Sequence, residues 1–511
     1  MANPGELKRL KVVITNTDGS RKQNISLLIS NMSIFEDIFK NTLYGAVDII
    51  DSVDLLNGLS SKDPLGKFGF QLLGEEFLEI DYEVEGRPPV SLRFAVYKIS
   101  GIVNHDNNTK RTYTLHFCSE EHLIDATNVV MKGYSQTHSD NIKSIANEFL
   151  FLDKEGTPFK GKRKKELLVQ PTMGLQRVVI PRLPPLQACQ FLARRSIAET
   201  TFTSATYLFF ENMNGFNFCD IEYLIKTGME KIKSGSFKNT KTSSEDYRYF
   251  FEKSVNNSDP NSFRREFKTI LQMSHKSYFD TVEKLKYGMF ESDMIVYDFV
   301  NHQTLPSRYR FLDNSDKTNN STLTLGNEAG KSVPENSITF MNSVISKDDK
   351  DIKYSRMFVI PKDLSSTNQD TYLDKIYPAR ASYFTRLAQN MYTLDTYGDP
   401  LIRAGDVIYL NIPAGGFDAS LNDTYQTGYF LVCTIQHIFT QNSYQTTMDV
   451  YKNALGAKVE TTEEAQQTKV TATDATPLIQ QYNSDIEDPS APEAKPDDGK
   501  TVINFFKGLI T

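Results

Sequence analysis

Residues 323–332, LTLGNEAGKS, are the part of this 511-residue chain that comes closest to a nucleotide site. A Walker phosphate loop needs four residues between its first glycine and its Gly-Lys pair, so that backbone amides can cradle the phosphates. Only three residues separate Gly326 from Gly330, and Pro334 stands where the following helix should run. We therefore interpret the segment as a loop and predict no cofactor.

A metal site has one candidate group, formed by His116, Cys118 and His122. If residues 111–117 form a strand, only His116 and Cys118 share a face, and no fourth ligand is evident. The chain also has no HExxH, no GxSxG and no cysteine paired to a local histidine, so hydrolytic catalysis has no visible anchor. The sequence predicts ordinary strand residues here, and no metal-binding or catalytic residue elsewhere.

A basic run, KGKRKK at residues 160–165, could contact phosphates. Such a run in a loop between a helix and a strand is more typical of a solvated surface, and we favour that interpretation.

An acidic row comes from strict alternation over residues 78–85. Side chains alternate between the two faces of a strand, so the apolar residues of this segment face a core and its carboxylates face the other way. The carboxylates are Glu79, Asp81, Glu83 and Glu85. The row is either an ordinary exposed face or a wall that repels a polyanion.

The elements that must position these residues begin with short antiparallel strands in the first 120 residues. The other expected strands are 27–35, 91–99 and 111–117, with turn signals such as EGRPP at 85–89 between them. This spacing is typical of a sandwich or small barrel.

Helical periodicity appears after residue 131. Apolar residues at i, i+3, i+4 and i+7 predict an amphipathic helix over 142–149, capped by Ser139 or Asp140, and a second helix opens at Pro184 and Pro185. The further expected elements are strands 205–211, 216–224 and 290–299, with polar loops at 254–262 and 313–336.

A last β-rich block starts with a predicted helix through Phe384, Leu387, Ala388 and Met391. Strands 407–412, 429–438 and 445–451 follow it. Beyond Lys452 the composition is too polar to bury a core, which predicts a flexible segment. Its last residues place Val502, Phe505, Phe506 and Leu509 in one apolar stripe at helical spacing. This stripe either docks on a partner or folds back on its own chain.

The predicted fold class is α+β and multidomain, with two small antiparallel β-barrel-like domains, α/β insertions between them and a disordered acidic tail. The boundaries are 1–130 for the first β-barrel-like domain, 131–240 for an α/β domain, 241–375 for a loop-rich α/β insertion, 376–456 for the second β-barrel-like domain, 457–500 for an acidic flexible tether and 501–511 for an amphipathic docking peptide.

Composition limits the broad class of protein. The net charge is -7, and residues 457–500 contribute -6 of it through ten acids and four lysines. The rest of the chain is nearly neutral, so its charge does not predict nucleic-acid binding. The four cysteines form no CxxC pair, which predicts buried thiols in a reducing compartment. No apolar run suits a membrane helix and no signal sequence opens the chain, so we expect neither membrane insertion nor secretion.

Three segments resemble, in the same order, the central hub protein of contractile phage baseplates of the T-even type. The first is NTLYG at 41–45 with IID at 49–51; the second lies within 186–224 and includes FLARR, YLFFE, GFNF and IEYL; the third runs from GDVIYL at 405–410 to YKNA at 451–454. The resemblance covers residues 1 to about 455 in outline. This chain departs from that type in its longer middle and its acidic tail.

The resemblance implies a homotrimer in which two β-barrel-like domains per chain form a ring of six similar units. Such a ring would join a tail tube or tube-initiator protein above to a trimeric spike or tail lysozyme-like protein below, with baseplate wedge and tape-measure proteins as further partners. DNA would pass only in transit, which would make the acidic row a candidate channel lining. The protein would be part of the virion tail, assembled in the host cytoplasm.

Two alternatives stay open. A hub of a related contractile injection or secretion system would share the fold and differ in its cargo. A tail-associated cell-wall hydrolase would need paired carboxylates in a cleft, and the abundance of Asp and Glu here does not discriminate.

Overall fold

The computed structural model describes residues 5–52, 55, 72–105, 110–175, 177–199, 205–235, 243–251, 266–278, 280, 282, 286–289, 291–298, 302–310, 358–361, 373–388, 390–413, 423 and 426–452. The chain divides into two compact units, Met1–Lys458 and Val459–Thr511, and all the described helices and strands belong to the first. The polar loops predicted at 254–262 and 313–336, the acidic tether and the stripe from Val502 to Leu509 lie outside the described residues.

In the part of the chain that the structure describes, the first β-block has seven strands and one short 3-10 helix. These are β1 (Leu7–Thr15), β2 (Lys22–Asn24), η1 (Ser26–Leu28), β3 (Ile29–Asp37), β4 (Tyr44–Asp51), β5 (Phe77–Val84), β6 (Val90–His105) and β7 (Lys110–Cys118). All their pairings are antiparallel, and the alternation predicted for β5 is confirmed because its apolar side chains are buried. The strands expected in this region are therefore present.

The second β-block consists of β18 (Asn390–Tyr397), β19 (Val407–Leu410), β20 (Gly428–Phe439) and β21 (Tyr444–Tyr451). It is extended by β13 (Arg248–Tyr249) and β14 (Ile270–Tyr278) from the middle of the chain. Helix α9 (Leu373–Leu387) precedes it. The prediction that the helix reaches Met391 is wrong, because Met391 lies in β18, where every second residue is buried.

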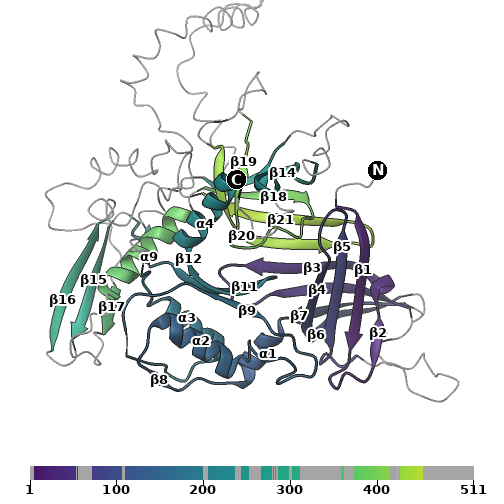
Figure 1. Cartoon of the computed structure of the whole chain (residues 1–511), viewed down its shortest axis with the longest axis horizontal. Helices are drawn as coiled ribbons and strands as arrows, with labels where there is room; N and C mark the ends of the chain where they lie inside the picture. The colour runs from purple at the N-terminus through teal and green to yellow at the C-terminus, as the bar shows by residue number, and fades with distance from the viewer. Residues whose placement is uncertain are drawn as a thin grey trace, which may run out of the picture. The chain divides into compact units, whose positions relative to one another are not determined.

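One hydrogen-bonded sheet contains both β-blocks. Its order is β14-β18-β21-β20-β3-β4-β7-β6-β5-β1-β2, with β19 and β13 branching from β20. The blocks meet where residues 32–37 of β3 pair with residues 434–439 of β20. Figure 1 shows this meeting, which we call the seam, as the contact between the yellow-green β20 and the purple β3. Strands from opposite ends of the sequence thus share one ladder of hydrogen bonds.

An α/β layer lies between the blocks in sequence. It contains α1 (Glu120–Thr127), β8 (Gly133–Tyr134), α2 (His138–Phe149), β9 (Glu166–Val169), β10 (Val178–Val179), α3 (Pro185–Ala193), β11 (Tyr207–Asn212), β12 (Gly215–Asp220) and α4 (Ile221–Ser234). Helices α2 and α3 pack side by side on the sheet of β11, β12 and β9 (Figure 1). Their apolar faces close one core with Phe209, Phe216 and Phe218.

Two sequence predictions in this layer need correction. Thr137, rather than Ser139 or Asp140, caps α2, since its hydroxyl accepts a hydrogen bond from the Asp140 amide at 3.2 Å. The strand predicted over 216–224 ends at Asp220, because α4 begins at Ile221 and its buried residues follow a helical period. The helix opening at Pro185 is confirmed.

A small sheet of β15 (Glu291–Asp298), β16 (Gln303–Arg310) and β17 (Phe358–Pro361) packs on α9. Strand β15 confirms the one predicted over 290–299. Among the described helices, none combines the length and apolarity required to cross a bilayer.

Glu222 of α4 is predicted to make stability depend on pH. Burial, and then the charge of Asp220, raise its pKa to about 8, although Arg386 opposes this rise. A carboxyl whose folded pKa exceeds its unfolded value stabilises the fold fully below about pH 4, and this contribution is lost as the pH rises through 8. Glu222→Gln should therefore flatten the fall of the free energy of unfolding between pH 4 and 9 by roughly 3–5 kcal/mol, because each tenfold change in proton affinity corresponds to about 1.4 kcal/mol. The control is Glu230→Gln at an exposed position of the same helix. The free energy of unfolding is measured by urea titration at each pH, and an equal dependence on pH for both variants would contradict the prediction.

Candidate functional site

The predicted acidic row lies on the partly exposed face of β5 and just beyond it. Glu79 pairs with Lys22 at 3.3 Å and Glu85 with Lys8 at 2.8 Å. Asp81 accepts a hydrogen bond from the Ser91 hydroxyl. On the neighbouring strand β1, Arg9 stands opposite Glu83 and Lys11 opposite Asp81. The row is thus flanked by a basic row, and its charge is largely compensated within the fold.

The candidate metal group is not assembled. The Nε2 atom of His116 lies 2.7 Å from the hydroxyl of Ser100, Cys118 is buried and His122 is exposed. Within the described residues, no group of three or more His, Cys, Asp or Glu side chains could hold a metal ion. The nucleotide-like segment 323–332 lies outside them.

The structure does assemble a buried polar network at the seam. Glu36 of β3, His437 of β20 and Tyr444 of β21 are fully buried there. The Tyr444 hydroxyl lies 2.8 Å from Nδ1 of His437, and Nε2 of the same ring lies 3.2 Å from Oε1 of Glu36. The second carboxylate oxygen of Glu36 accepts the backbone N–H of Ala404 at 2.9 Å. One chain of polar contacts therefore runs from the second β-block into the first.

Protonation at the seam follows from burial and from Arg403. Burial tends to raise the pKa of Glu36, but the hydrogen bond with His437 and the charge of Arg403 outweigh it and hold the pKa below its usual range. Burial lowers the pKa of His437. A neutral ring satisfies both neighbours if its Nε2–H donates to Glu36 and its Nδ1 accepts from Tyr444. The buried carboxylate is then balanced by Arg403.

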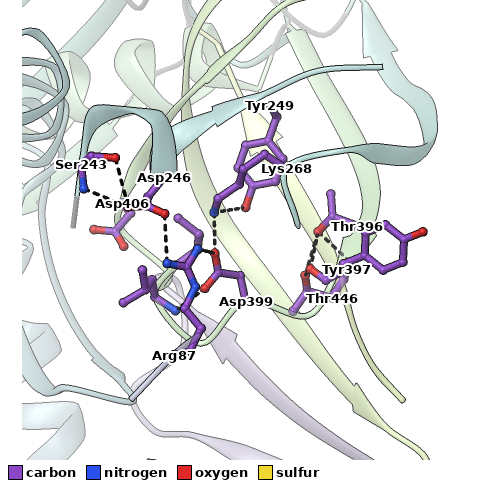
Figure 2. A network of polar contacts seen from close by, with 12 residues as sticks. Arg87, Ser243, Asp246, Tyr249, Lys268, Thr396, Tyr397, Asp399, Asp406 and Thr446 are labelled. Carbon is purple, nitrogen blue, oxygen red and sulfur yellow. Dashed lines mark hydrogen bonds and ion pairs between the residues drawn. The ribbon is translucent and has the colours of Figure 1, made fainter. Parts of the chain in front are cut away.

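A second buried network, the charge quartet of Arg87, Asp246, Lys268 and Asp399, joins the β5–β6 turn to the second β-block. Figure 2 shows the Arg87 guanidinium reaching both carboxylates, at 3.0 Å from Asp246 and 2.7 Å from Asp399. Lys268 lies 2.6 Å from the same carboxylate oxygen of Asp399, Oδ2, that Arg87 contacts. All four side chains are at most 5% exposed, so two positive and two negative charges are buried together.

Asp399 is the centre of the charge quartet. Burial alone would raise its pKa, but Lys268 and Arg87 outweigh burial and lower the pKa to about 2. Since Arg87 comes from the first β-block and Lys268 from the middle of the chain, Asp399 holds three distant segments at one point. Buried charges require partners of opposite sign, and each of the four has one at 3.0 Å or less.

A third network, the α1 cluster of Glu121, Lys162, Lys165 and Glu211, fixes the α/β layer on the first β-block. Lys162 pairs with Glu121 at 3.2 Å, and Lys165 contacts both Glu121 and Glu211. Glu211 also accepts the Leu43 amide at 3.0 Å, in the turn between β3 and β4. The interpretation of residues 160–165 as a solvated run is therefore wrong for Lys162 and Lys165, whose ammonium groups are held inside the protein by partners from α1 and β11.

Other residues of the loop at 159–165 also contact the first β-block. Arg93 of β6 donates to the Lys160 carbonyl at 2.9 Å, and Arg163 donates to the Ser91 carbonyl at 3.1 Å. Phe159 lies against Phe77, with 5.4 Å between ring centroids. Together, the three networks connect the two β-blocks and the α/β layer through buried contacts.

The likeness of this chain to known proteins lies in its fold. No family model matches the chain, and neither does any curated protein. Solved structures that match include a tail protein from Neisseria meningitidis (10% identity, 87% of this chain and 97% of that chain, TM-score 0.43) and the 43 kDa tail protein of a prophage of Shewanella oneidensis (9%, 87% and 98%, 0.42). A component of the Escherichia coli type VI secretion system also matches (8%, 89% and 80%, 0.38), and it is described as similar to bacteriophage T4 tail proteins.

These structures are described as a tail protein, a prophage tail protein and a component of a secretion system. At identities of 10% or less and TM-scores below 0.5, the likeness does not extend to function, which depends on this chain's own residues.

Proposed function

We propose that this chain is a structural subunit of the central hub of a contractile tail baseplate, acting as a homotrimeric symmetry adapter without enzymatic activity. The observation that carries the proposal is the seam, where β3 and β20 pair residues from opposite ends of the chain and bury Glu36, His437 and Tyr444. An adapter that presents six similar units from three chains needs its two β-blocks held in a fixed relation. The seam and the charge quartet supply such a constraint, and the sequence resemblance supplies the role.

The partners follow from the resemblance. We propose a tail tube or tube-initiator protein on one side of the ring and a spike or tail lysozyme-like protein on the other, with the assembled protein in the virion tail. A hub of a related injection or secretion system would have the same architecture, so the genes that neighbour this one would separate the two.

The test is the mass of the purified chain in solution, measured alone and with its candidate spike partner. The expected species has three times the 58.1 kDa of the chain. A stable monomer at micromolar concentration with and without the partner would overturn the proposal. Incubation with purified cell-wall polymer is expected to release no sugar, and release would favour a hydrolase instead.

The acidic row is proposed to line the passage of the trimer. A wall of lysines would hold the phosphates of passing DNA through a strong, salt-dependent attraction, whereas a compensated wall lets them slide. Changing Glu79, Asp81 and Glu83 together to Lys should therefore create binding to a short DNA duplex at 50 mM salt, with a salt slope that steepens by about 1 for each lysine that reaches a phosphate. The matched control, Glu148, Asp293 and Glu230 changed to Lys, adds the same charge elsewhere. Equal duplex binding by both variants would place the row outside the passage.

The C-terminal peptide is proposed to dock on the spike or on a neighbouring baseplate subunit. Deleting residues 501–511 should leave the trimer intact and weaken capture of one partner by about tenfold or more, since several large apolar side chains at ~1.5–3 kcal/mol each would lose their contacts, less the cost of ordering the segment. Affinity measured by titration, with Lys507→Ala as the control within the peptide, checks this. Loss of the trimer, or unchanged capture of every partner, would contradict it.

A further inference from the structure

The end of β21 is hydrogen-bonded to a neighbouring strand on each of its two edges. Tyr451, its last residue, pairs with Met391 of β18 on one side and with Leu431 of β20 on the other. The strand is therefore hydrogen-bonded along both edges up to the point where residues 453–511 begin. A pull along its axis from the C-terminal side loads both ladders at once, in shear.

One residue further on, Lys452 extends the attachment beyond the strand. Its backbone N–H donates to the Asn390 carbonyl at 2.9 Å. Its side chain turns into the protein, is fully buried, and donates from Nζ to the carbonyls of Gln426 and Thr427, both at 3.0 Å. The ammonium group also lies 5.1 Å from the centre of the Phe430 ring. An ordinary lysine at the end of a strand would keep this group in water.

The residues that receive Lys452 are themselves fixed. The Gln426 side-chain oxygen accepts the Asn390 amide at 3.1 Å and the Tyr392 hydroxyl at 2.8 Å. The ring of His275, from β14, stacks on Tyr392 with 4.0 Å between centroids. Burial lowers the pKa of Lys452 to about 7, and a neutral amine still carries two N–H groups for the two carbonyls. The contact therefore persists in either protonation state.

We propose that Asn390, Tyr392, Gln426, Thr427 and Lys452 form a mechanical anchor, through which force on residues 453–511 enters the central strands of the sheet instead of peeling β21 from its end. The inference deepens the proposed role of the C-terminal segment as a docking element, since a segment that holds a partner must be held by its own body. Its test applies force directly and does not depend on whether any partner binds.

The test is force spectroscopy on the full chain in two pulling geometries. A thiol handle is added by Glu148→Cys, at an exposed position of α2, and it reacts alone because Cys118, Cys189, Cys219 and Cys433 are buried. Force is applied between this handle and a C-terminal tag, or between the handle and an N-terminal tag. Lys452→Met leaves the two carbonyls without their donor, which should raise the unfolding rate at constant force about tenfold in the C-terminal geometry. It should leave the rate in the N-terminal geometry nearly unchanged.

Two further variants keep the test decisive. Tyr392→Phe removes only the hydroxyl that positions Gln426, and should produce the same directional effect to a smaller degree if Lys452→Met fails to fold. Lys132→Met removes an exposed lysine, paired with Glu148 at 2.8 Å in the native chain, and should change neither geometry. Equal acceleration in both geometries would make Lys452 a general stabiliser, and no acceleration in the C-terminal geometry would exclude an anchor; either result overturns the proposal.

Discussion

Asp399→Asn is expected to lower the free energy of unfolding by about 3–5 kcal/mol, because it removes one carboxylate of a buried charge network and leaves Arg87 and Lys268 with Asp246 as the one remaining anion of the quartet. In the native protein, Asp399 lies 2.7 Å from Arg87 and 2.6 Å from Lys268, with all three side chains at most 5% exposed. After the change, Lys268 keeps the hydroxyl of Tyr249 at 3.4 Å and loses its only ion-pair contact within the described charge quartet. Urea unfolding near pH 7 measures the loss.

Two controls separate charge from packing in this prediction. Glu148→Gln breaks an exposed pair of similar length, 2.8 Å from Lys132, and should cost no more than about 1 kcal/mol. The double variant Asp399→Asn with Lys268→Met removes one charge of each sign and should recover much of the loss. If the double variant loses more free energy of unfolding than the two single variants lose together, the quartet is not held by charge.

The same variant carries a pH signature. Since the pKa of Asp399 is about 2 in the folded protein and near 3.9 in an unfolded chain, its contribution is present above about pH 4 and is lost as the pH falls from 4 to 2. Asp399→Asn lacks this group, so the stability difference between the two proteins should shrink across that window. A difference that stays constant from pH 6 to 2 would mean that Asp399 is not charged in the fold.

The strands of the first β-block are predictable because their alternation is nearly complete. Strand β5 alternates carboxylates with Leu78, Ile80, Tyr82 and Val84, and the structure buries the apolar set. Strand β18 escapes prediction for the opposite reason. Its buried positions include Asn390 and Thr396 beside Tyr392 and Leu394, so half of its core face is polar and a period of two is hidden.

The seam does leave a signal in the sequence. Glu36 follows Met32 and Ile34 at the alternate positions of β3, and therefore lies on the same buried face of the strand. His437 similarly lies between Ile435 and Phe439 on the buried face of β20. A charged residue at a core position of a strand requires a buried partner, although the sequence alone does not name it.

The charge quartet leaves no comparable signal. Arg87 sits in a turn, in the segment EGRPP, where an exposed arginine is ordinary by pattern, and its partner Asp399 is 312 positions away. The burial of lysines in the basic run 160–165 is hidden for a related reason, because Glu121 and Glu211 that bind them are also far apart in the chain. Local periodicity predicts which face is buried, while ion pairs of this kind depend on the topology that brings distant strands together.

Gly398→Ala is expected to destabilise the protein by about 3–5 kcal/mol, as the sum of overpacking and of a broken buried hydrogen-bond chain. A Cβ at position 398 would lie 2.2 Å from two atoms of the Tyr444 ring, far inside contact distance. The ring cannot yield easily, since it is fully buried and stacked on Phe439 with 4.5 Å between centroids. Its displacement would pull the hydroxyl away from His437 and leave the seam's polar chain incomplete. Thermal and urea unfolding measure the effect.

We attribute the stability lost in Gly398→Ala to displacement of the Tyr444 ring at the seam rather than to local strain at the glycine. A double-mutant cycle distinguishes the two causes. Gly133→Ala, whose new Cβ would meet only Val179 at 3.9 Å, should cost less than about 1 kcal/mol. If the cost of Gly398→Ala arises from the ring, it should nearly vanish in a Tyr444→Ala background, giving a coupling energy close to the whole cost of Gly398→Ala. Additive losses would show that the cost of Gly398→Ala does not arise from the Tyr444 ring, and the explanation through the seam would fail. Because a fixed relation between the blocks is what the proposed ring requires, a seam weakened in this way should also reduce the yield of trimer at physiological temperature before it unfolds either block.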